Sequence, residues 1–386
     1  MIQFSRLPEL SLYIHLPWCV RKCPYCDFNS HELQADLPEQ AYVDAVIADL
    51  EYSLPLIWGR PVISIFIGGG TPSLFSARAI DRLLSAVRAR VVLEPGAEIT
   101  LEANPGTFEA ERFRGYAQAG VNRLSLGVQS FDSEKLQRLG RIHDADQAMR
   151  AAEMAMQIFP QVNLDLMFGL PGQTLRELER DLACALSFQT PHLSLYQLTI
   201  EPNTAFAVIP PQPAPADDDT LFDMQEFLIA QTAAVGYQRY EISAYAKPGQ
   251  VCRHNLNYWT FGDYLGIGAG AHAKISLKNR ILRQARLRHP RDYMANAGSP
   301  AGIQVERELR VDELAFEFML NALRLTGGVP PSRWSETTGL AIGQHPFLLE
   351  RLGLAQQRGL LAPGPSVWRA SDKGLNFLND LQQIFL

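Results

Sequence analysis

Short apolar runs alternate with longer helical patterns through about the first 200 residues, and this alternation limits the fold more than any other feature of the sequence. Runs rich in β-branched and aromatic residues predict six strands, at 12–16, 62–67, 98–102, 123–129, 162–168 and 193–200. Helical periodicity predicts the helices between them, at 39–54, 77–90, 108–119, 145–158 and 175–187. Such alternation is typical of a parallel sheet with right-handed crossovers. Six units are too few to close an eight-stranded barrel, so we expect an α/β fold with a partial (β/α)6 barrel or an open sheet.

The pattern changes in the second half of the chain. A proline-rich and then acidic stretch at 210–219 marks a break or a surface loop. Three further elements are predicted after it: a helix at 220–235, a strand at 237–243 and a helix at 312–325. Residues 359–386 predict a small helical or winged-helix-like module. We therefore expect a barrel domain at 1–207 and a C-terminal mixed α/β and helical region at 208–386 that closes its mouth.

Composition and charge exclude several classes of function. Lysine and arginine total 35 against 41 aspartate and glutamate, a formal charge of −6, which gives no general attraction to nucleic acid. No run approaches the roughly 18 apolar residues that a membrane-spanning helix needs. The first residues lack the apolar core and cleavage site of a signal peptide. The sequence thus predicts a cytoplasmic protein without a nucleic-acid partner.

Three of the five cysteines, Cys19, Cys23 and Cys26, fall within eight residues. A large cytoplasmic protein keeps its thiols reduced, so this trio predicts a metal site rather than a disulfide framework. Soft thiolates suit either an iron–sulfur cluster or zinc. Zinc would take a fourth ligand, which His15 or His31 could supply, whereas a cubane cluster on three cysteines leaves one iron open. The isolated Cys184 is predicted to be an inert buried thiol.

Other unusual residues follow the predicted strands in the same way as the cysteines. Glycines and a threonine at 68–71 follow the second strand, and residues 102–105 follow the third. Gln129 ends the fourth strand, and Asp165 lies within the fifth. In parallel α/β folds the carboxyl ends of the strands form the rim where active sites are built. The sequence therefore predicts one shared site at this rim.

The cysteine spacing, Cys19-x3-Cys23-x2-Cys26 with Tyr25 before the last cysteine, resembles the signature of the radical S-adenosylmethionine (SAM) superfamily. The resemblance extends to the subfamily of oxygen-independent coproporphyrinogen III oxidase and its relatives, and it covers most of the chain from Leu12 to Trp259. It is carried, in order, by the stretches YIHLPWCVRKCPYCDFNSH, IGGGTPS, LEANPGT, LSLGVQSFD, LGRIHDADQA, NLDLMFGLPGQT and HNLNYW.

The resemblance implies a [4Fe–4S] cluster on the three cysteines, whose open iron binds the methionine part of SAM. An electron from the reduced cluster would cleave SAM to a 5′-deoxyadenosyl radical, which would require an electron donor as a partner. The residues matching SAM-binding positions are Tyr13, Tyr25, Gly69, Gly70, Thr71, Glu102, Gln129, Arg141 and Asp165. Without the resemblance the glycines could form a simple turn, Glu102 or Asp165 a helix cap or ion pair, and Arg141 a surface charge.

Two departures separate this chain from the oxidases of that subfamily. Phe28 stands where the oxidases carry a further cysteine, and only 18 residues precede Cys19, too few for their N-terminal extension. Both features resemble the shorter relatives in the heme chaperone (HemW) group. That resemblance implies binding of heme and its delivery to apo-proteins, without coproporphyrinogen III oxidase activity. An oxidase and a radical SAM methyltransferase stay as alternatives.

The stretch HNLNYW is similar to a motif of the same group and makes His254 the candidate heme ligand. Imidazole is a good axial ligand for heme iron, and Tyr258 and Trp259 could stack on a flat macrocycle. Alternatively, His254 only hydrogen-bonds a loop while the aromatic rings fill a core. Cys252 is a weaker candidate ligand. The resemblance also implies a homodimer, and membrane-bound heme acceptors would imply peripheral association with a membrane.

Overall fold

The computed structural model describes residues 2–106 and 109–386. Its central feature is a twelve-stranded sheet in the order β14-β13-β12-β11-β1-β4-β5-β6-β7-β8-β10-β9. Six consecutive strands of this order pair in parallel. These six are β1 (Leu10–Leu16), β4 (Val62–Gly69), β5 (Leu93–Ala103), β6 (Arg123–Gln129), β7 (Gln161–Phe168) and β8 (His192–Gln197).

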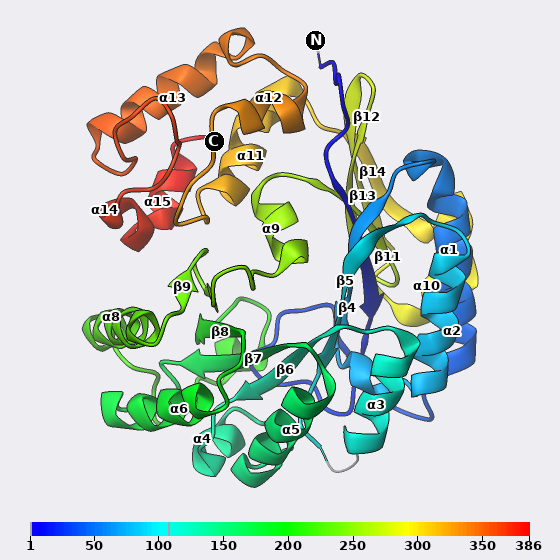
Figure 1. The fold of residues 1–386 in the computed structure, drawn as a ribbon, viewed down its shortest axis with the longest axis vertical. Helices are drawn as coiled ribbons and strands as arrows, with labels where there is room; N and C mark the ends of the chain where they lie inside the picture. The colour runs from blue at the N-terminus through cyan, green and yellow to red at the C-terminus, as the bar shows by residue number, and fades with distance from the viewer. Residues whose placement is uncertain (1, 107–108) are drawn as a thin grey trace.

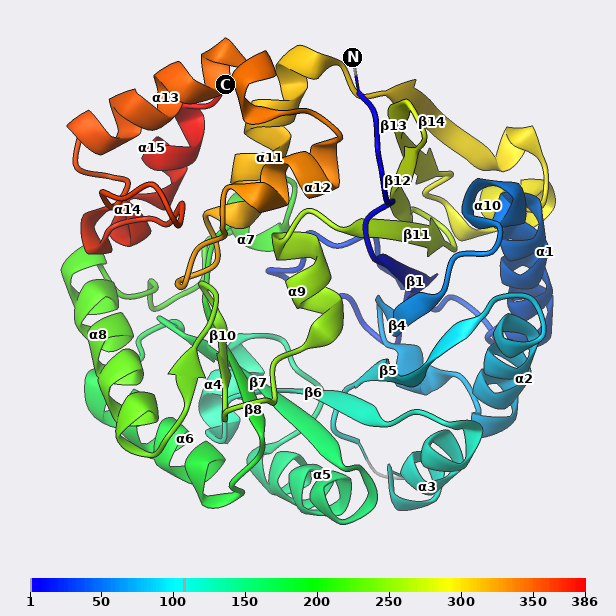
Figure 2. The ribbon, with the colours of Figure 1, turned by 45° about the horizontal axis from the view of Figure 1, so that its top comes forward.

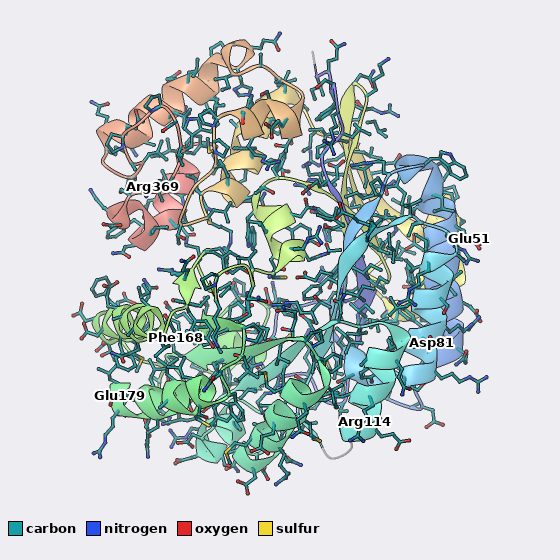
Figure 3. The ribbon with its side chains drawn as sticks, viewed as in Figure 1. Glu51, Asp81, Arg114, Phe168, Glu179 and Arg369 are labelled. Carbon is teal, nitrogen blue, oxygen red and sulfur yellow. The ribbon has the colours of Figure 1, made fainter. Side chains whose placement is uncertain are left out.

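Helices from the crossovers cover the outer face of this curved sheet (Figures 1 and 2). They are α1 (Glu39–Ile57), α2 (Ala77–Arg88), α3 (Glu109–Ala119), α4 (Ser133–Arg138), α5 (Ala145–Ile158), α6 (Leu175–Ser187) and α8 (Asp218–Ala234). Figure 3 shows Glu51, Asp81 and Arg114 pointing outward from α1, α2 and α3, whereas Phe168 lies inside. Apolar side chains of the strands and of the inner helix faces form one continuous core.

The predicted strands and helices of the first half are confirmed. The bounds of β6, α5 and α6 are the predicted ones, and the others differ by a few residues, most at the start of β5. Thr174 caps α6 through a capping box with Glu177. Residue 108, where one helix was predicted to begin, lies outside the described residues. Among the described residues no pairing joins the edge strands β14 and β9, so the barrel is partial, as predicted.

Strands from the second half extend this sheet at both edges. Beyond β1, β11 (Asp263–Ile267) pairs in parallel, so that Ile14 lies between Ile67 and Ile267. The antiparallel strands β12 (His272–Leu277), β13 (Arg280–Arg286) and β14 (Ile303–Glu308) follow. Beyond β8 lie the antiparallel strands β10 (Ala244–Ala246) and β9 (Gln238–Arg239). The sequence analysis predicted no strand in the region 263–308.

The predicted strand at 237–243 is wrong for most of its length. Only Gln238 and Arg239 form a strand there, and the chain then bends before β10 begins at Ala244. At this bend the buried Glu241 carboxylate accepts a hydrogen bond from the Ser243 amide at 3.0 Å and pairs with Arg324. These two contacts hold the chain in the bent conformation.

A buried ion pair ties the sheet extension to α1. The Asp49 carboxylate on α1 accepts hydrogen bonds from Arg286 Nε on β13 at 2.9 Å and from the Tyr293 hydroxyl at 2.9 Å. Tyr293 belongs to α10 (Pro290–Asn296), which packs against α1. The Gly268 amide also donates to Asp49, at 3.2 Å. This carboxylate therefore joins a helix of the first half to three segments of the second.

Residues 314–383 form a helical module, larger than the one expected at 359–386, with its own apolar core around Phe318, Trp334 and Trp368. Its helices are α11 (Leu314–Ala322), α12 (Ser332–Thr338), α13 (Pro346–Gln357), α14 (Asp372–Asn376) and α15 (Leu378–Gln383). In Figure 2 the strands and helices form an incomplete ring, and this module lies in its gap, between α8 and β12–β14. The domain boundary between residues 207 and 208 falls in α7 (Ala205–Val208) and stays a prediction.

Short elements complete the fold. Two of them, β2 (Trp18–Cys19) and β3 (His31–Glu32), form a small parallel pair, and α9 (Arg253–Trp259) lies inside the ring (Figure 2). Four 3-10 helices occupy Pro72–Leu74, Pro300–Gly302, Val311–Glu313 and Ile342–Gln344. Within the described part of the chain, every helix is too short or too polar to cross a membrane.

Candidate functional site

The three clustered cysteines lie on the loop that follows β1. Pairing of β2 with β3 joins the two ends of this loop, and the Cys26 amide donates to the Cys23 carbonyl at 3.1 Å. All three thiols are half-buried and line one cavity of about 610 Å³. Burial raises the pKa of Cys19, and the neighbouring thiols Cys26 and Cys23 raise it further. The predicted trio is thus brought together at the rim of the barrel.

The donor set of this loop fits an iron–sulfur cluster. Three thiols on one short loop are soft sulfur ligands of the kind such clusters take, and Arg141 Nη1 lies 3.6 Å from Cys23 Sγ. No three His, Cys, Asp or Glu side chains of residues 2–106 and 109–386 are placed to hold a metal ion directly. A cubane cluster holds its cysteines further apart than a mononuclear ion does, because each sulfur binds a different iron atom.

The two suggested zinc ligands both lie outside the cysteine cavity. The ring nitrogens of His15 lie 2.8 Å from the Tyr13 hydroxyl and 2.9 Å from the Asn29 carbonyl oxygen, and burial lowers the pKa of His15 to about 4. His31 packs edge-on against His289, with ring centroids 5.4 Å apart. Neither histidine lines the cavity that holds the three thiols.

The glycines after β4 allow the chain to pass close to the cysteine loop. Gly70 donates its amide to the Leu16 carbonyl at 2.8 Å, and a Cβ on Gly70 would lie 2.5 Å from the Trp18 carbonyl oxygen. Gly69 has φ +124°, which side chains rarely adopt. The Thr71 amide donates to the Trp18 carbonyl oxygen at 2.7 Å. The close packing of this segment against residues 17–18 therefore requires glycine even without a bound ligand.

Two carboxyl groups face the same cavity from β5 and β7. Glu102 accepts a hydrogen bond from the Gly69 amide at 3.1 Å, and Asp165 accepts from Ser125 and Asn163 at 2.9 and 2.8 Å. Burial, together with the nearby Asp165 carboxyl, raises the pKa of Glu102 to about 8. Burial also raises the pKa of Asp165. Neither carboxyl is a helix cap, and both are positioned to meet a polar or cationic ligand.

Arg141 is drawn into the site rather than exposed on the surface. Its guanidinium donates to Asn104 Oδ1 at 2.5 Å and to the Gly127 carbonyl at 2.9 Å, in addition to its contact with Cys23. Asn104 Nδ2 donates in turn to Thr71 Oγ1 at 3.0 Å. Asn104 belongs to the predicted rim stretch 102–105, but its sequence position did not indicate this contact with Arg141. These bonds link the ends of β4, β5 and β6 to the cysteine loop.

Most predicted SAM residues line this one cavity, and two predicted residues do not. The cavity is lined by Tyr25, Gly69, Gly70, Thr71, Glu102, Gln129, Arg141 and Asp165 together with the three cysteines. Gln129 adopts φ +68° at a register shift that ends β6. Tyr13 lines a second, neighbouring cavity instead. His254 lies behind Tyr13 and Phe66, at ring-centroid distances of 6.4 and 5.1 Å.

His254 is 1% exposed and fully hydrogen-bonded. Its ring nitrogens lie 3.0 Å from Ser64 Oγ and 3.0 Å from the Tyr258 hydroxyl. Burial lowers the pKa of His254 to about 3, so the ring is neutral. Heme ligation by His254 would require one of these bonds to break, and it stays a prediction. Nearby Cys252 is buried, 3.4 Å from a Glu98 carboxylate oxygen.

Cys184 differs from its prediction. It is half-buried rather than buried, because α6 presents it near the edge of its apolar face. Burial still raises the pKa of its thiol to about 11, which keeps it protonated at neutral pH.

Stability of the ligand-free protein should depend on pH through Glu102. The carboxyl has a higher pKa folded than unfolded, so its stabilising contribution is complete below about pH 4.5 and is lost as the pH rises through 8. The free energy of unfolding should fall by at most about 1.4 kcal/mol per pH unit over this window. Glu102→Gln should lack this slope in urea titrations between pH 5 and 9. Parallel pH profiles of the two proteins would contradict the assignment.

Comparison with known proteins places the chain in a class. Residues 13–185 match the Radical SAM superfamily model, and residues 309–377 match the HemN C-terminal domain model. The structure of coproporphyrinogen III oxidase (HemN) from Escherichia coli aligns with 98% of this chain and 90% of its own, with a TM-score of 0.82. At 22% identity this likeness shows a shared fold. The fold and the cysteine loop are those of a radical SAM protein.

Full-length relatives define the family more narrowly. The chain is 49% identical to "Heme chaperone HemW" of Escherichia coli K12 and 47% identical to that of Haemophilus influenzae, covering 99% of each chain. It is 35% identical to the Bacillus subtilis protein of the same name, over 97% of this chain and 99% of that one. This chain belongs to the HemW family of radical SAM proteins. The resemblance found in the sequence is confirmed.

Proposed function

We propose that this protein is a heme chaperone, which binds heme and delivers it to apo-proteins. The observation that carries the proposal is its identity of 35–49%, over nearly the whole length of both chains, to proteins named heme chaperones. The three-cysteine loop and the adjoining cavity support a [4Fe–4S] cluster and SAM as the other bound groups. We further propose a cytoplasmic location, with peripheral association where a heme acceptor sits in a membrane.

The cluster and SAM would be held by residues of the first cavity and its border. Cys19, Cys23 and Cys26 would bind the cluster, which when reduced supplies one electron for cleavage of SAM. Arg141 contacts Cys23 Sγ and donates to Asn104, which donates in turn to Thr71. The remaining residues proposed to contact SAM are Tyr13, Tyr25, Gly69, Gly70, Glu102, Gln129 and Asp165. An external electron donor is needed if SAM is cleaved, and we propose a homodimer as the family's assembly.

Heme transfer tests the proposal directly. The anaerobically reconstituted protein, loaded with one equivalent of heme, is mixed with an excess of apo-myoglobin as a trap and with a membrane-free apo-cytochrome. Specific delivery predicts faster holo-cytochrome formation than free heme gives at the same concentration. The rate at which apo-myoglobin captures heme should not exceed the rate at which the chaperone releases heme spontaneously. Equal rates with and without the protein would contradict delivery.

The oxidase alternative makes an opposite prediction. With SAM, a reductant and coproporphyrinogen III under anaerobic conditions, we expect no protoporphyrinogen by chromatography. Phe28 occupies the position where the oxidases carry a further cysteine. Its side chain is 63% exposed and lines the cavity. Formation of protoporphyrinogen over many turnovers would overturn the chaperone proposal in favour of the oxidase. Appearance of a methylated product would favour the methyltransferase.

A further inference from the structure

A second cavity of about 700 Å³ adjoins the first, within the range of about 300–1,000 Å³ typical of cofactor sites. Phe28, Gly69 and Glu102 line both cavities, so the two meet at the ends of β4 and β5. The second cavity extends away from the cysteines toward the sheet extension and α9. A ligand in this space would therefore lie beside the SAM site without occupying it.

One wall of the second cavity is a single face of the sheet extension. Tyr264 of β11 is paired with Lys274 of β12, Lys274 with Arg283 of β13, and His272 with Ala285. Because side chains alternate along strands, paired residues and residues two apart share a face. All five of these residues line the cavity. The wall thus carries an aromatic ring, an imidazole and two basic side chains.

The adjoining wall is aromatic and comes from the end of α9. Tyr258 packs edge-on against Tyr264, with ring centroids 4.5 Å apart, and Trp259 follows it along the helix. The hydrogen bond between His254 Nε2 and the Tyr258 hydroxyl fixes the orientation of this ring. Phe28 and Tyr13 border the side toward the first cavity. Such rings offer flat apolar surfaces to a conjugated macrocycle.

His272 is the one cavity imidazole that is free to bind iron. It is exposed, and neither of its ring nitrogens has a hydrogen-bond partner among residues 2–106 and 109–386, whereas both nitrogens of His15 are bonded. Partial burial lowers the pKa of His272, and Arg283 and Arg288 lower it further. The ring is therefore neutral at physiological pH, the form in which imidazole coordinates metals.

The basic groups around His272 differ in availability. Lys274 is buried against Asp263 at 2.9 Å, and Arg283 pairs with Glu317 while donating to the Tyr264 hydroxyl at 2.6 Å. Arg288 is exposed at the cavity border, and its guanidinium has no ion pair within the described ranges. A guanidinium without a carboxylate partner suits an anionic ligand group.

We propose that the second cavity binds heme, with His272 as an axial ligand of the iron, the aromatic wall against the macrocycle and Arg288 on a propionate. This proposal rests on heme being the cargo and assigns its place. It gives the HNLNYW stretch a different part from ligation, because Tyr258 and Trp259 form the wall and His254 holds Tyr258. Heme so placed would lie next to SAM, across Gly69 and Glu102.

The axial ligand is tested by spectroscopy of the ferric heme complex of the reconstituted full-length protein. His272→Ala should lose the absorption and electron paramagnetic resonance signature of imidazole ligation and bind heme at least tenfold more weakly. Added imidazole should restore the signature. His254→Ala removes only the support of Tyr258, so it should weaken heme binding while the bound heme keeps the imidazole signature. The surface control His289→Ala should change neither. Far-ultraviolet circular dichroism and iron–sulfur absorbance report whether each variant is folded and loaded.

The propionate contact is tested with an esterified ligand. Arg288→Gln should weaken binding of heme about tenfold and leave binding of heme dimethyl ester unchanged, because the ester has no carboxylate to pair. Equal losses for both ligands would overturn this contact. An unchanged imidazole signature in His272→Ala, or its loss in His254→Ala alone, would overturn the site while leaving the heme chaperone function intact. Failure of the unsubstituted protein to bind heme would overturn both.

Discussion

Replacing Cys23 with alanine is expected to leave the protein without its iron–sulfur cluster. The three thiols of the cysteine loop face one cavity, and a cluster held by three cysteines has no spare protein ligand to replace one. After anaerobic reconstitution, the variant should lose the brown absorbance and nearly all bound iron and sulfide. Because SAM would bind to the open iron, SAM affinity should fall at least tenfold, as measured by equilibrium dialysis.

Cys184→Ala is the matched control for this experiment. Cys184 is also half-buried, but it lies on α6 and does not line the cavity of the other three. This variant should retain the full iron and sulfide content. Retention of the cluster by Cys23→Ala, or one zinc ion without sulfide in the unsubstituted protein, would contradict the cluster assignment.

Replacing Asp49 with alanine is expected to lower the free energy of unfolding by about 3–5 kcal/mol. Arg286 is 1% exposed, so removal of the carboxylate leaves its guanidinium buried without its counter-charge. The Tyr293 hydroxyl and the Gly268 amide lose the same acceptor. Urea-induced unfolding followed by circular dichroism measures the loss. The substitution should loosen the contact between α1 and the sheet extension, because Asp49 joins the two.

Asp44→Ala provides the comparison on the same helix. Asp44 pairs with Arg82 at the surface, and exposed pairs contribute about 0–1 kcal/mol. A loss in Asp49→Ala no larger than in Asp44→Ala would show that the buried pair does not hold the extension in place. Asp49→Asn, which keeps the shape and one oxygen acceptor, should fall between the two.

The parallel core was predictable because its strands and helices leave different patterns in the sequence. The strands are short apolar runs that are buried on both faces, whereas the helices bury one face and repeat about every 3.6 residues. Helices α5 and α6 begin at capping boxes, Asp144 with Gln147 and Thr174 with Glu177, so their starts are encoded within four residues. The strands beyond residue 260 were missed. Stretches such as HAKISL and RILRQAR alternate, but they place Lys274 and Arg286 in the interior. Their partners Asp263 and Asp49 are 11 and 237 residues away, and local patterns cannot show such pairs.

The candidate site was predictable where function follows from position at the barrel rim. The cysteines, the glycines and Glu102 follow or end strands, and Asp165 lies within β7; all of them line one cavity. The surroundings of Arg141 and His254 depend on tertiary contacts, such as the one with Asn104 and the one with Ser64. His272 was not predicted as a site residue, because its surroundings also depend on tertiary contacts. The pairing of β12 with β13 places it on the same cavity wall as Arg283.

The late arrival of β11 next to β1 has a consequence for synthesis of the nascent chain. Strand β1 acquires one neighbour when β4 emerges from the ribosome, but its other edge stays unpaired until residue 267 is made. At about 5–20 residues per second, the roughly 200 residues between β4 and β11 take about 10–40 s. An open, apolar strand edge is a template for pairing with other chains. We therefore expect slow translation of the middle of the message to promote aggregation of this protein.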